Sequence, residues 1–339
     1  MAGKKERKQE SVAKPQAASR KELAAVDRAL VESLKQRGEL VSGAPLPKAA
    51  VESLLREIVG VCQAQVSPLR VAYLGPEHSF SHAAALHRFG HGPELVPVAT
   101  IGAVFAEVEH GNCAFGMAPL ENSNHGRVTD TLDCFSRSAV RICGELPLRI
   151  HHCLLGVGER RQVRVVCSKP QALDQCRNWI AEHLPGAEQR AMASTSEAAK
   201  LAKGDPTIAA IASEQAGREL GLSLLARNIE DHAENITRFA VLSRESGPKT
   251  GKDKTALMIE LPHEPGALAD AMVIFKRQRL NLTWIESFPI PGSRGRYLFF
   301  IEFVGHAAEL RPRRAIAALE KRAVKVVVLG SYAEAAVVE

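Results

Sequence analysis

The 339-residue sequence lacks the features that mark several large classes of protein. No stretch approaches the roughly 18 apolar residues that a membrane-spanning helix requires. The basic N-terminus is not followed by the apolar segment of a signal peptide. The seven cysteines are scattered and include no C-x-x-C pair, which argues against a disulfide framework or a zinc site and indicates reduced thiols. We therefore expect a cytoplasmic protein with no membrane partner.

The sequence also lacks the short motifs of cofactor and acyl-transfer chemistry. It has no G-x-S-x-G, no Walker A and no G-x-G-x-x-G motif, so acyl transfer and nucleotide binding have no support. His151 and His152, and the histidines between 78 and 91, lack carboxylate or thiolate partners at metal-ligand spacing, which favours structural roles. We expect no cofactor and no metal.

The net charge of +6 would suggest a nucleic-acid partner if it were spread over the chain. Residues 1–21 hold seven Lys and Arg against two Glu, a surplus of five, which leaves about +1 for the other 318 residues. Residues 1–19 are thus expected to form a disordered basic tail. A tail that binds polyanions is the alternative. The body of the protein is not expected to bind nucleic acid.

Three blocks follow the tail. Residues 20–67 carry apolar side chains at helical spacing on both sides of a turn at 43–47, which predicts two amphipathic helices. Such helices must dock on the chain or on a partner to bury their apolar faces. Residues 69–245 repeat strand–loop–helix units, which predicts mainly parallel sheets covered by helices, in one sheet or in two lobes with a cleft.

Residues 246–252 have the composition of a linker. The last block, 253–332, reads β-α-β-β-α-β, the ferredoxin-like order. Its strands are expected at 255–261, 281–288, 296–304 and 324–330, with one helix opened by Pro265-Gly266 and another at about 308–322.

In the central block, polar residues concentrate in loops between strands and helices. One such loop is Gly75-Pro-Glu-His-Ser-Phe-Ser81, and another is Glu121-Asn-Ser-Asn-His-Gly126. The N–H groups at helix N-termini bind anions, although Ser and Asn also cap helices in any protein. The residues alone thus predict a two-lobed α/β binder of a small carboxylated ligand, followed by a ferredoxin-like module.

At these loops the sequence resembles prephenate dehydratase, over residues 69 to about 332. GPEHSFS at 75–81 is similar to the family's GPxGTFS motif, and PLENSNHG at 119–126 to PIENSxxG. SKPQAL at 168–173 and NITRF at 235–239 follow in family order. The resemblance implies a two-lobed, periplasmic-binding-protein-like α/β domain that converts prephenate to phenylpyruvate, CO2 and water.

The resemblance also implies site residues. The family assigns the proton donor to the threonine of its T-R-F motif, which is Thr237 here. Arg238 is expected to anchor a carboxylate or hold the loop, and Glu121 to position other groups. The full set expected around the substrate is Ser79, Phe80, Glu121, Asn122, Ser123, Asn235, Arg238 and Phe239. Ser79 replaces the usual threonine, and His78 and His125 stand where small or acidic residues are usual, which predicts altered pH dependence near neutrality.

The C-terminal block resembles an ACT domain, a module that in this family binds phenylalanine at a subunit interface. Phenylalanine is thus the expected effector of a homodimer or homotetramer. The expected effector residues are Gly266, Ala267, Leu268, Glu286, Ser287 and Pro289. Phe288 departs from the family, which has arginine at this position, so the strength or selectivity of the response is open.

Residues 20–67 resemble a chorismate mutase from which the middle helix has been lost. Arg20 and Arg37 match that family's arginines, but Lys48, in the turn, is a poor substitute for the lost lysine. We expect a helical remnant without mutase activity, acting as a dimerisation arm. A bifunctional mutase–dehydratase, an arogenate dehydratase and a non-catalytic ligand sensor on the same scaffold are the alternatives.

Overall fold

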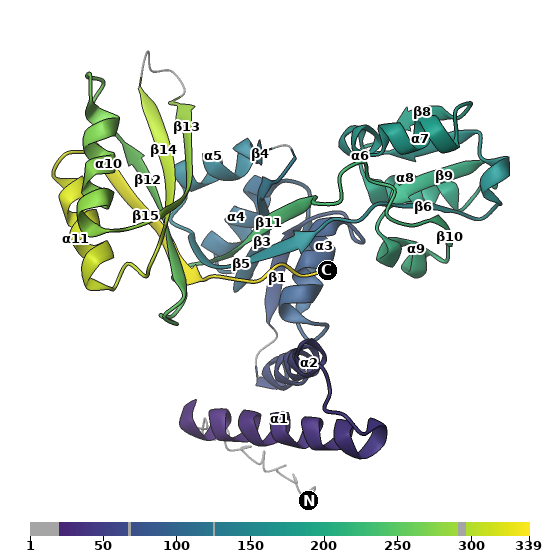
Figure 1. The fold of residues 1–339 in the computed structure, drawn as a ribbon, viewed down its shortest axis with the longest axis horizontal. Helices are drawn as coiled ribbons and strands as arrows, with labels where there is room; N and C mark the ends of the chain where they lie inside the picture. Colours follow the sequence, from purple (N-terminus) through teal and green to yellow (C-terminus); the bar gives the residue numbers. More distant parts are fainter. Residues whose placement is uncertain (1–19, 67–68, 125, 291–295) are drawn as a thin grey trace, which may run out of the picture.

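The computed structural model describes residues 20–66, 69–124, 126–290 and 296–339, and Figure 1 shows their arrangement. An N-terminal pair of helices precedes three β-sheets, one in each of three units along the chain. The predicted tail at 1–19 lies outside the described residues, as does His125. The predicted fold class, a two-lobed α/β domain with a ferredoxin-like domain and a helical arm, is confirmed.

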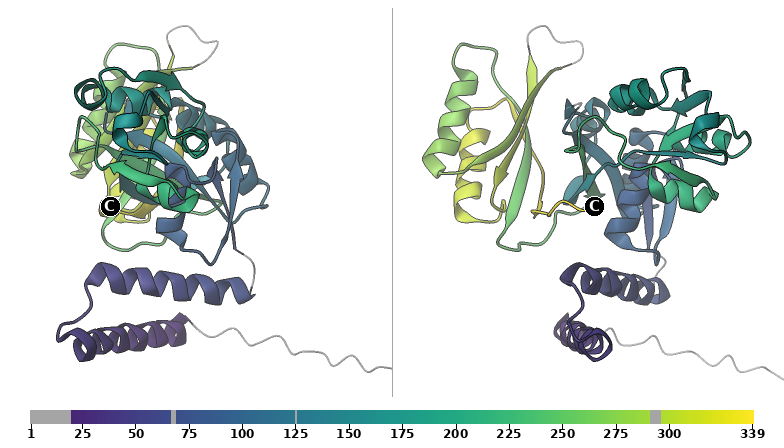
Figure 2. Two further views of the ribbon diagram at one scale, coloured as in Figure 1. Left: turned by 90° about the vertical axis from the view of Figure 1, so that its right-hand side faces the viewer. Right: turned by 45° about the vertical axis from the view of Figure 1, so that its right-hand side comes forward.

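The first two helices, α1 (Arg20–Ser42) and α2 (Lys48–Val66), lie against each other below the rest of the molecule (Figure 2). Their apolar stripes are only partly used in this pairing. Leu40 is 81% exposed and Val41 is 78% exposed, while Val51 of α2 is buried. The hairpin therefore leaves apolar surface uncovered within the described chain.

Lobe 1 is built on the sheet β2-β1-β3-β11-β5, to which β4 adds by pairing with β3. Strands β1 (Arg70–Leu74), β2 (Glu94–Val98) and β3 (Phe115–Asn122) are parallel, and β11 (Ile236–Ser243) is antiparallel to both β3 and β5 (Arg141–Arg149). The sheet is therefore mixed because β11 returns to it after lobe 2. Its other elements are α3 (Phe80–Phe89), α4 (Ile101–Glu109), β4 (Gly126–Arg127) and α5 (Thr129–Arg137).

Lobe 2 is built on the sheet β10-β6-β9-β7-β8. Its elements are β6 (Cys153–Gly156), η1 (Arg160–Gln162), β7 (Val165–Ser168), α6 (Pro170–Gln175), α7 (Arg177–His183), β8 (Glu188–Ala191), α8 (Thr195–Ala202), β9 (Ile208–Ala212), α9 (Glu214–Leu220) and β10 (Ser223–Ala226). Two segments join the lobes, one from β5 to β6 and one from β10 to β11. They are bonded to each other, since the Ile150 N–H donates to Asn235 O (2.7 Å) and the Ile229 N–H to His152 O (2.9 Å).

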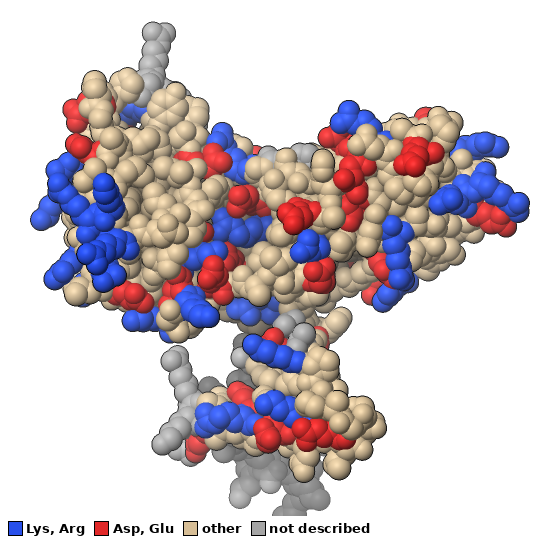
Figure 3. Space-filling view, viewed as in Figure 1, with Lys and Arg blue, Asp and Glu red and all other residues tan. Residues whose placement is uncertain are grey.

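The C-terminal domain has the antiparallel sheet β13-β14-β12-β15. Its elements are β12 (Asp253–Glu260), α10 (Ala267–Gln278), β13 (Leu282–Pro289), β14 (Tyr297–Val304), α11 (Leu310–Glu320) and β15 (Lys325–Ala333). Helices α10 and α11 cover one face, and the other face turns toward lobe 1 (Figure 2). Lys and Arg side chains gather on the outer side of these helices (Figure 3).

The inner face of this sheet shares a hydrophobic core with lobe 1. Phe300, Tyr332 and Phe288 pack in one cluster with Leu132 and Phe135 of α5. At Gly330 of β15, a Cβ would lie 2.0 Å from Ile142 O of β5, so only glycine allows this approach. After β15 the chain runs back along β5, where Arg149 N–H donates to Val338 O and Val338 N–H donates to Pro147 O. The C-terminal domain is thus fixed to lobe 1 by both packing and backbone pairing.

Candidate active site

Thr237 faces Asn122 across two neighbouring strands of lobe 1. The two residues are register partners in β11 and β3, and Asn122 Nδ2 donates to Thr237 Oγ1 at 2.9 Å. The hydroxyl oxygen acts as the acceptor in this bond, which leaves the O–H hydrogen available for another group. The pair therefore presents a half-buried hydroxyl whose oxygen is held by an amide.

A chain of side-chain amides continues from this pair to lobe 2. Asn122 Nδ2 also donates to Asn235 Oδ1 (2.9 Å), and Asn235 Nδ2 donates to Gln175 Oε1 (3.2 Å) at the end of α6. Gln175 Oε1 lies 2.7 Å from Nε2 of His152. Asn235 is fully buried and His152 almost so, while Asn122 and Gln175 are half-buried, so the chain connects lobe 1, the connecting segments and lobe 2 with Asn235 shielded from water at its centre.

Glu230 fixes the two histidines at the junction between the lobes. Its buried carboxylate lies 2.7 Å from Nδ1 of His151 and accepts the His152 N–H at 2.9 Å. Burial lowers the pKa of His152, so its ring stays neutral at neutral pH. Burial also disfavours a charge on His151, but its hydrogen bonds to Glu230 and Glu339 outweigh this and raise its pKa.

The remaining polar groups predicted for this site serve local structure. Ser79 caps α3: its hydroxyl accepts the His82 N–H (3.3 Å) and donates to Leu74 O (3.3 Å). The Ser123 hydroxyl donates to Glu234 O and accepts the Ile236 N–H, which ties its loop to β11. The Phe80 ring packs edge-on against His152, with the ring centroids 5.5 Å apart.

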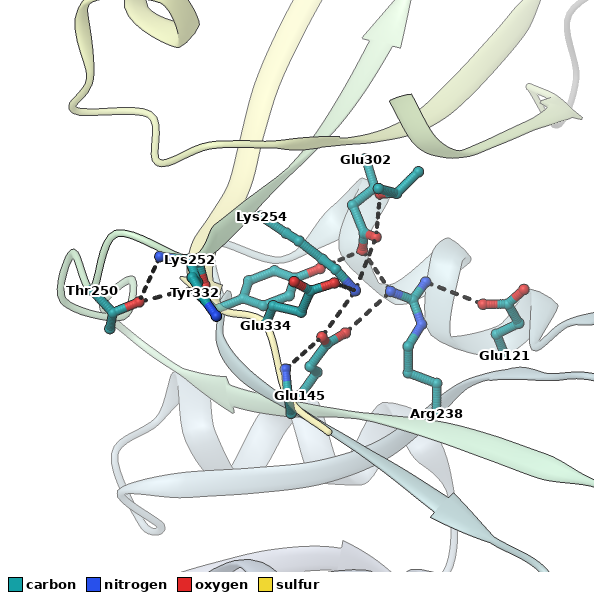
Figure 4. Close-up of polar contacts among 11 residues, drawn as sticks. Glu121, Glu145, Arg238, Thr250, Lys252, Lys254, Glu302, Tyr332 and Glu334 are labelled. Carbon is teal, nitrogen blue, oxygen red and sulfur yellow. Dashed lines mark hydrogen bonds and ion pairs between the residues drawn. The ribbon is translucent and has the colours of Figure 1, made fainter. Parts of the chain in front are cut away.

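Arg238 does not share the location of Thr237, because consecutive residues of a strand point to opposite faces. Its guanidinium lies under the C-terminal domain and pairs with Glu302 (2.7 Å), Glu121 (3.1 Å) and Glu145 (3.2 Å), as Figure 4 shows. Three carboxylates thus engage the Arg238 guanidinium, and its two expected roles, anchoring a substrate carboxylate or holding the loop, stay predictions. The pKa of Arg238, which burial would lower, is raised by Glu302, Tyr332 and Glu145.

Two other expected substrate residues also lie away from the hydroxyl. Glu121 pairs with Arg238 on the face toward the C-terminal domain. Phe239 is buried in the core beneath α3, with Tyr73 and Met117. Of the predicted set, the structure thus brings Asn122, Asn235 and Thr237 into one hydrogen-bonded group, and it assigns Glu121 and Phe239 to neighbouring contacts.

The expected effector residues fall into two separate places in the C-terminal domain. Ala267 and Leu268, with Gly266 as the N-cap of α10, lie beside a pocket of about 150 Å³ that also includes Tyr297 and Phe299. Glu286 instead pairs with Arg127 of β4 at 2.6 Å, and Arg127 also donates to Ser287 O. Phe288 is buried against lobe 1, while Pro289 ends β13 and is exposed.

Sequence reasoning did not single out Gln175 and Glu230 for this site. Gln175 follows the SKPQAL run by two residues, and Glu230 opens the loop before β11. An isolated Gln or Glu carries no motif, and these side chains gain a role only where the lobes meet. Neither a metal-ligand group nor a helix long and apolar enough to span a membrane is found among the residues that the structure describes.

Comparison with known proteins identifies close similarity to one family. The family model for prephenate dehydratase matches residues 71–247. The bifunctional chorismate mutase/prephenate dehydratase of Stutzerimonas stutzeri is 42% identical over 305 residues, which is 89% of this chain and 83% of that protein.

Two solved structures resemble the chain at the level of fold. A prephenate dehydratase from Arthrobacter aurescens in complex with L-Phe has 33% identity and a TM-score of 0.73, covering 78% of this chain and 90% of that one. A protein described as a quorum quenching acylase, GqqA, has 29% identity and a TM-score of 0.72, covering 78% and 98%.

Proposed function

The chain belongs to the prephenate dehydratase family, and from this premise we propose that Thr237 donates the proton in its reaction. The enzyme is a decarboxylating lyase that converts prephenate to phenylpyruvate, CO2 and water. The observation that carries the proposal is the bond from Asn122 Nδ2 to Thr237 Oγ1, which holds the hydroxyl oxygen and leaves its hydrogen free to donate.

The reaction needs little besides this donor and a site for two carboxylates. The bond from the ring to its carboxylate breaks, its electron pair enters the ring, and the ring C–O bond breaks as the hydroxyl leaves. Aromatisation drives both changes. The departing hydroxide takes the Thr237 proton and becomes water, the Asn122 N–H supports the negative charge left on the Thr237 oxygen, and solvent returns the proton.

Residues around this donor are proposed to hold the substrate. The N-terminus of α3, which Ser79 caps, offers the backbone N–H of Phe80 to a carboxylate. Asn122, Ser123 and Asn235 fix the chain on both sides of Thr237 through the hydrogen bonds described above. Glu121, Arg238 and Phe239 do not contact the substrate in this proposal and instead hold strands β3 and β11 in place.

Replacing Thr237 tests the proposal directly. Thr237→Ala should lower kcat by about 10²- to 10⁴-fold, the range of general acid catalysis, with KM for prephenate within a few fold of wild type. Thr237→Ser keeps the hydroxyl and should retain much more activity. Wild-type protein that leaves prephenate unchanged at neutral pH would refute the function, and a fully active Thr237→Ala would refute the donor.

We further propose that phenylalanine regulates this enzyme from the C-terminal domain, as an effector at the N-terminus of α10. Support comes from the structural neighbour that holds L-Phe and from the pocket beside Ala267 and Leu268. Cytoplasmic location is proposed as well, and the seven free cysteines support it. A homodimer or homotetramer is proposed because helices α1 and α2 leave apolar surface uncovered.

The curated relatives that are named as bifunctional make mutase activity the second candidate. We propose that this chain lacks it: Arg37 is exposed, and Lys48 pairs with Glu52 of its own helix at 3.6 Å. Turnover of prephenate, arogenate and chorismate, each with and without phenylalanine, separates the candidates. Chorismate conversion that disappears in Arg37→Ala would establish a mutase.

A further inference from the structure

Two cross-strand pairs lie back to back on β3 and β11. Asn122 faces Thr237 and the adjacent Glu121 faces Arg238. Successive side chains alternate between the faces of a sheet, so the first pair points to the proposed active site and the second to the C-terminal domain. A one-residue bulge at Leu120 of β3 follows this double pair, and such bulges recur beside active sites.

Arg238 joins lobe 1 to the C-terminal domain through one guanidinium. Nη1 pairs with Glu302 of β14 and with Glu145 of β5, Nη2 pairs with Glu121, and the guanidinium stacks 4.8 Å from the Trp284 ring of β13. The Arg238 side chain is only 12% exposed. All four partners sit on strands other than its own, and two of them, Glu302 and Trp284, belong to the C-terminal sheet, so the position of Arg238 depends on how the two sheets are docked.

Two of the three carboxylates around Arg238 accept further hydrogen bonds from the C-terminal part of the chain (Figure 4). Glu302 accepts hydrogen bonds from the Tyr332 hydroxyl (2.5 Å) and the Thr283 hydroxyl (2.7 Å). Glu145 accepts from Lys254 Nζ (3.0 Å) and from the Ala335 N–H (3.1 Å). Burial would raise the pKa of Glu302, but Arg238 and these hydroxyls outweigh burial and lower it, so the carboxylate stays charged at neutral pH.

A shift of the C-terminal sheet must therefore move Arg238 or separate buried charges. Leaving a buried carboxylate without its cation is strongly unfavourable, so Arg238 should follow Glu302. Arg238 directly follows Thr237 in the sequence. Its partner Glu121 directly precedes Asn122, whose side chain donates to the Thr237 hydroxyl. A displacement of Arg238 and Glu121, on the face of the lobe 1 sheet toward the C-terminal domain, would thus also move Thr237 and Asn122.

We propose that Arg238 is a positioning residue: through Glu302 and Glu145, the docked C-terminal domain sets the position of the Thr237 hydroxyl. The inference rests on the proposed role of Thr237. It assigns two roles to the T-R-F motif, on opposite faces of one strand. The threonine donates the proton, and the arginine couples the strand to the position of the C-terminal domain. It also gives the regulatory domain a route to the active site that runs through a single strand.

The variant Glu302→Gln tests this inference with a substitution in the C-terminal domain, so that no residue of lobe 1 is changed. It removes one charge from the cluster, so Arg238 should relax toward Glu145 and Glu121. We expect kcat for prephenate to fall by about 10- to 100-fold, as for a small misplacement of a catalytic group, with KM within about twofold. The milder Thr283→Val, which removes one bond to Glu302, should lower kcat in the same direction and serves if Glu302→Gln does not fold.

A structural control separates positioning from simple loss of stability. Leu319→Ala opens a cavity in the fully buried core between α10 and α11, away from the cluster. It should lower the midpoint of thermal unfolding and keep kcat near wild type below that temperature. If Glu302→Gln and Thr283→Val behave like Leu319→Ala, the inference is wrong while the function stands. If the wild type does not act on prephenate, the function itself fails.

Discussion

At the scale of single residues, a histidine at the junction of the two lobes lies between two carboxylates. His151 lies between Glu230, which is buried, and Glu339, which is exposed, with Nδ1 and Nε2 at 2.7 and 3.3 Å from the two carboxylates. One carboxylate belongs to the segment before β11 and the other to the segment after β15. The imidazole therefore holds the end of the C-terminal segment against the junction of the lobes.

This arrangement predicts a pH dependence of stability. The pKa of His151 is raised in the folded chain, so its contribution is fully present below the ordinary value of 6.5 and is lost as pH rises through the folded value. As pH rises above about 6.5, the midpoint of thermal unfolding should fall more in wild type than in His151→Gln. The exposed His110 provides the control His110→Gln, which should follow wild type. Equal pH profiles for all three proteins would contradict the prediction.

At the scale of elements, the contact between β5 and β15 decides how the C-terminal domain docks. Gly330 brings the two strands closer than any side chain would allow, and its φ of 155° lies in a region that other residues avoid. The same strands carry Glu145 and Tyr332, which belong to the Arg238 cluster. The close approach is therefore a condition for the buried ion pairs as well as for packing.

Gly330→Ala should accordingly weaken docking. A Cβ at 2.0 Å from Ile142 O forces the strands apart, at a cost of about 1–3 kcal/mol in the free energy of unfolding, as for other overpacked sites. Denaturant titration measures this cost. Gly186→Ala is the matched control, because a Cβ there meets nothing within 4 Å, and it should change stability by less than about 0.5 kcal/mol. Equal stabilities of the two variants would show that the strands can separate freely.

Elements were more predictable from the sequence than the contacts between them. Apolar spacing and turn residues indicate the helices at 20–66 and the β-α-β-β-α-β order of the last block because these signals are local. Strand alternation places Thr237 and Arg238 on opposite faces of β11, whereas the motif that contains both suggested that both meet the substrate. Partners of Arg238 such as Glu302 are distant in the chain, and only the docking of two sheets brings them together.

At the scale of the whole molecule, the helical hairpin α1–α2 lies below lobe 1 (Figure 2), which it contacts through α2, where Glu57 pairs with His91 at 3.0 Å. Leu23, Val26, Leu40 and Val41 of α1 are all more than half exposed. Stable helices of this length normally bury an apolar face. In a single copy of the described chain these side chains are in water, which is the reason to expect an assembly.

The exposed apolar side chains of α1 predict that the protein forms a dimer or a tetramer, which its molar mass in solution reports. Light scattering should give two or four times the chain mass of 36.7 kDa for wild type. The double variant Leu40→Ser, Val41→Ser should shift this mass toward a single chain because it removes exposed apolar surface from the hairpin. Val157→Ser, at an exposed apolar position of lobe 2, is the control and should leave the mass unchanged. A monomeric wild type would refute the prediction.

The return of β11 to the centre of lobe 1 also determines the order in which the chain can fold during synthesis. Strand β5 ends at Arg149, and β11, which must lie between β3 and β5, begins at Ile236. At translation rates of about 5–20 residues per second, the ribosome needs on the order of ten seconds to cover this gap. Lobe 2 is one continuous segment and can therefore fold first. Lobe 1, although begun earlier, waits with an open centre until the strand that carries Thr237 emerges, so the proposed catalytic group is also the piece that completes the sheet.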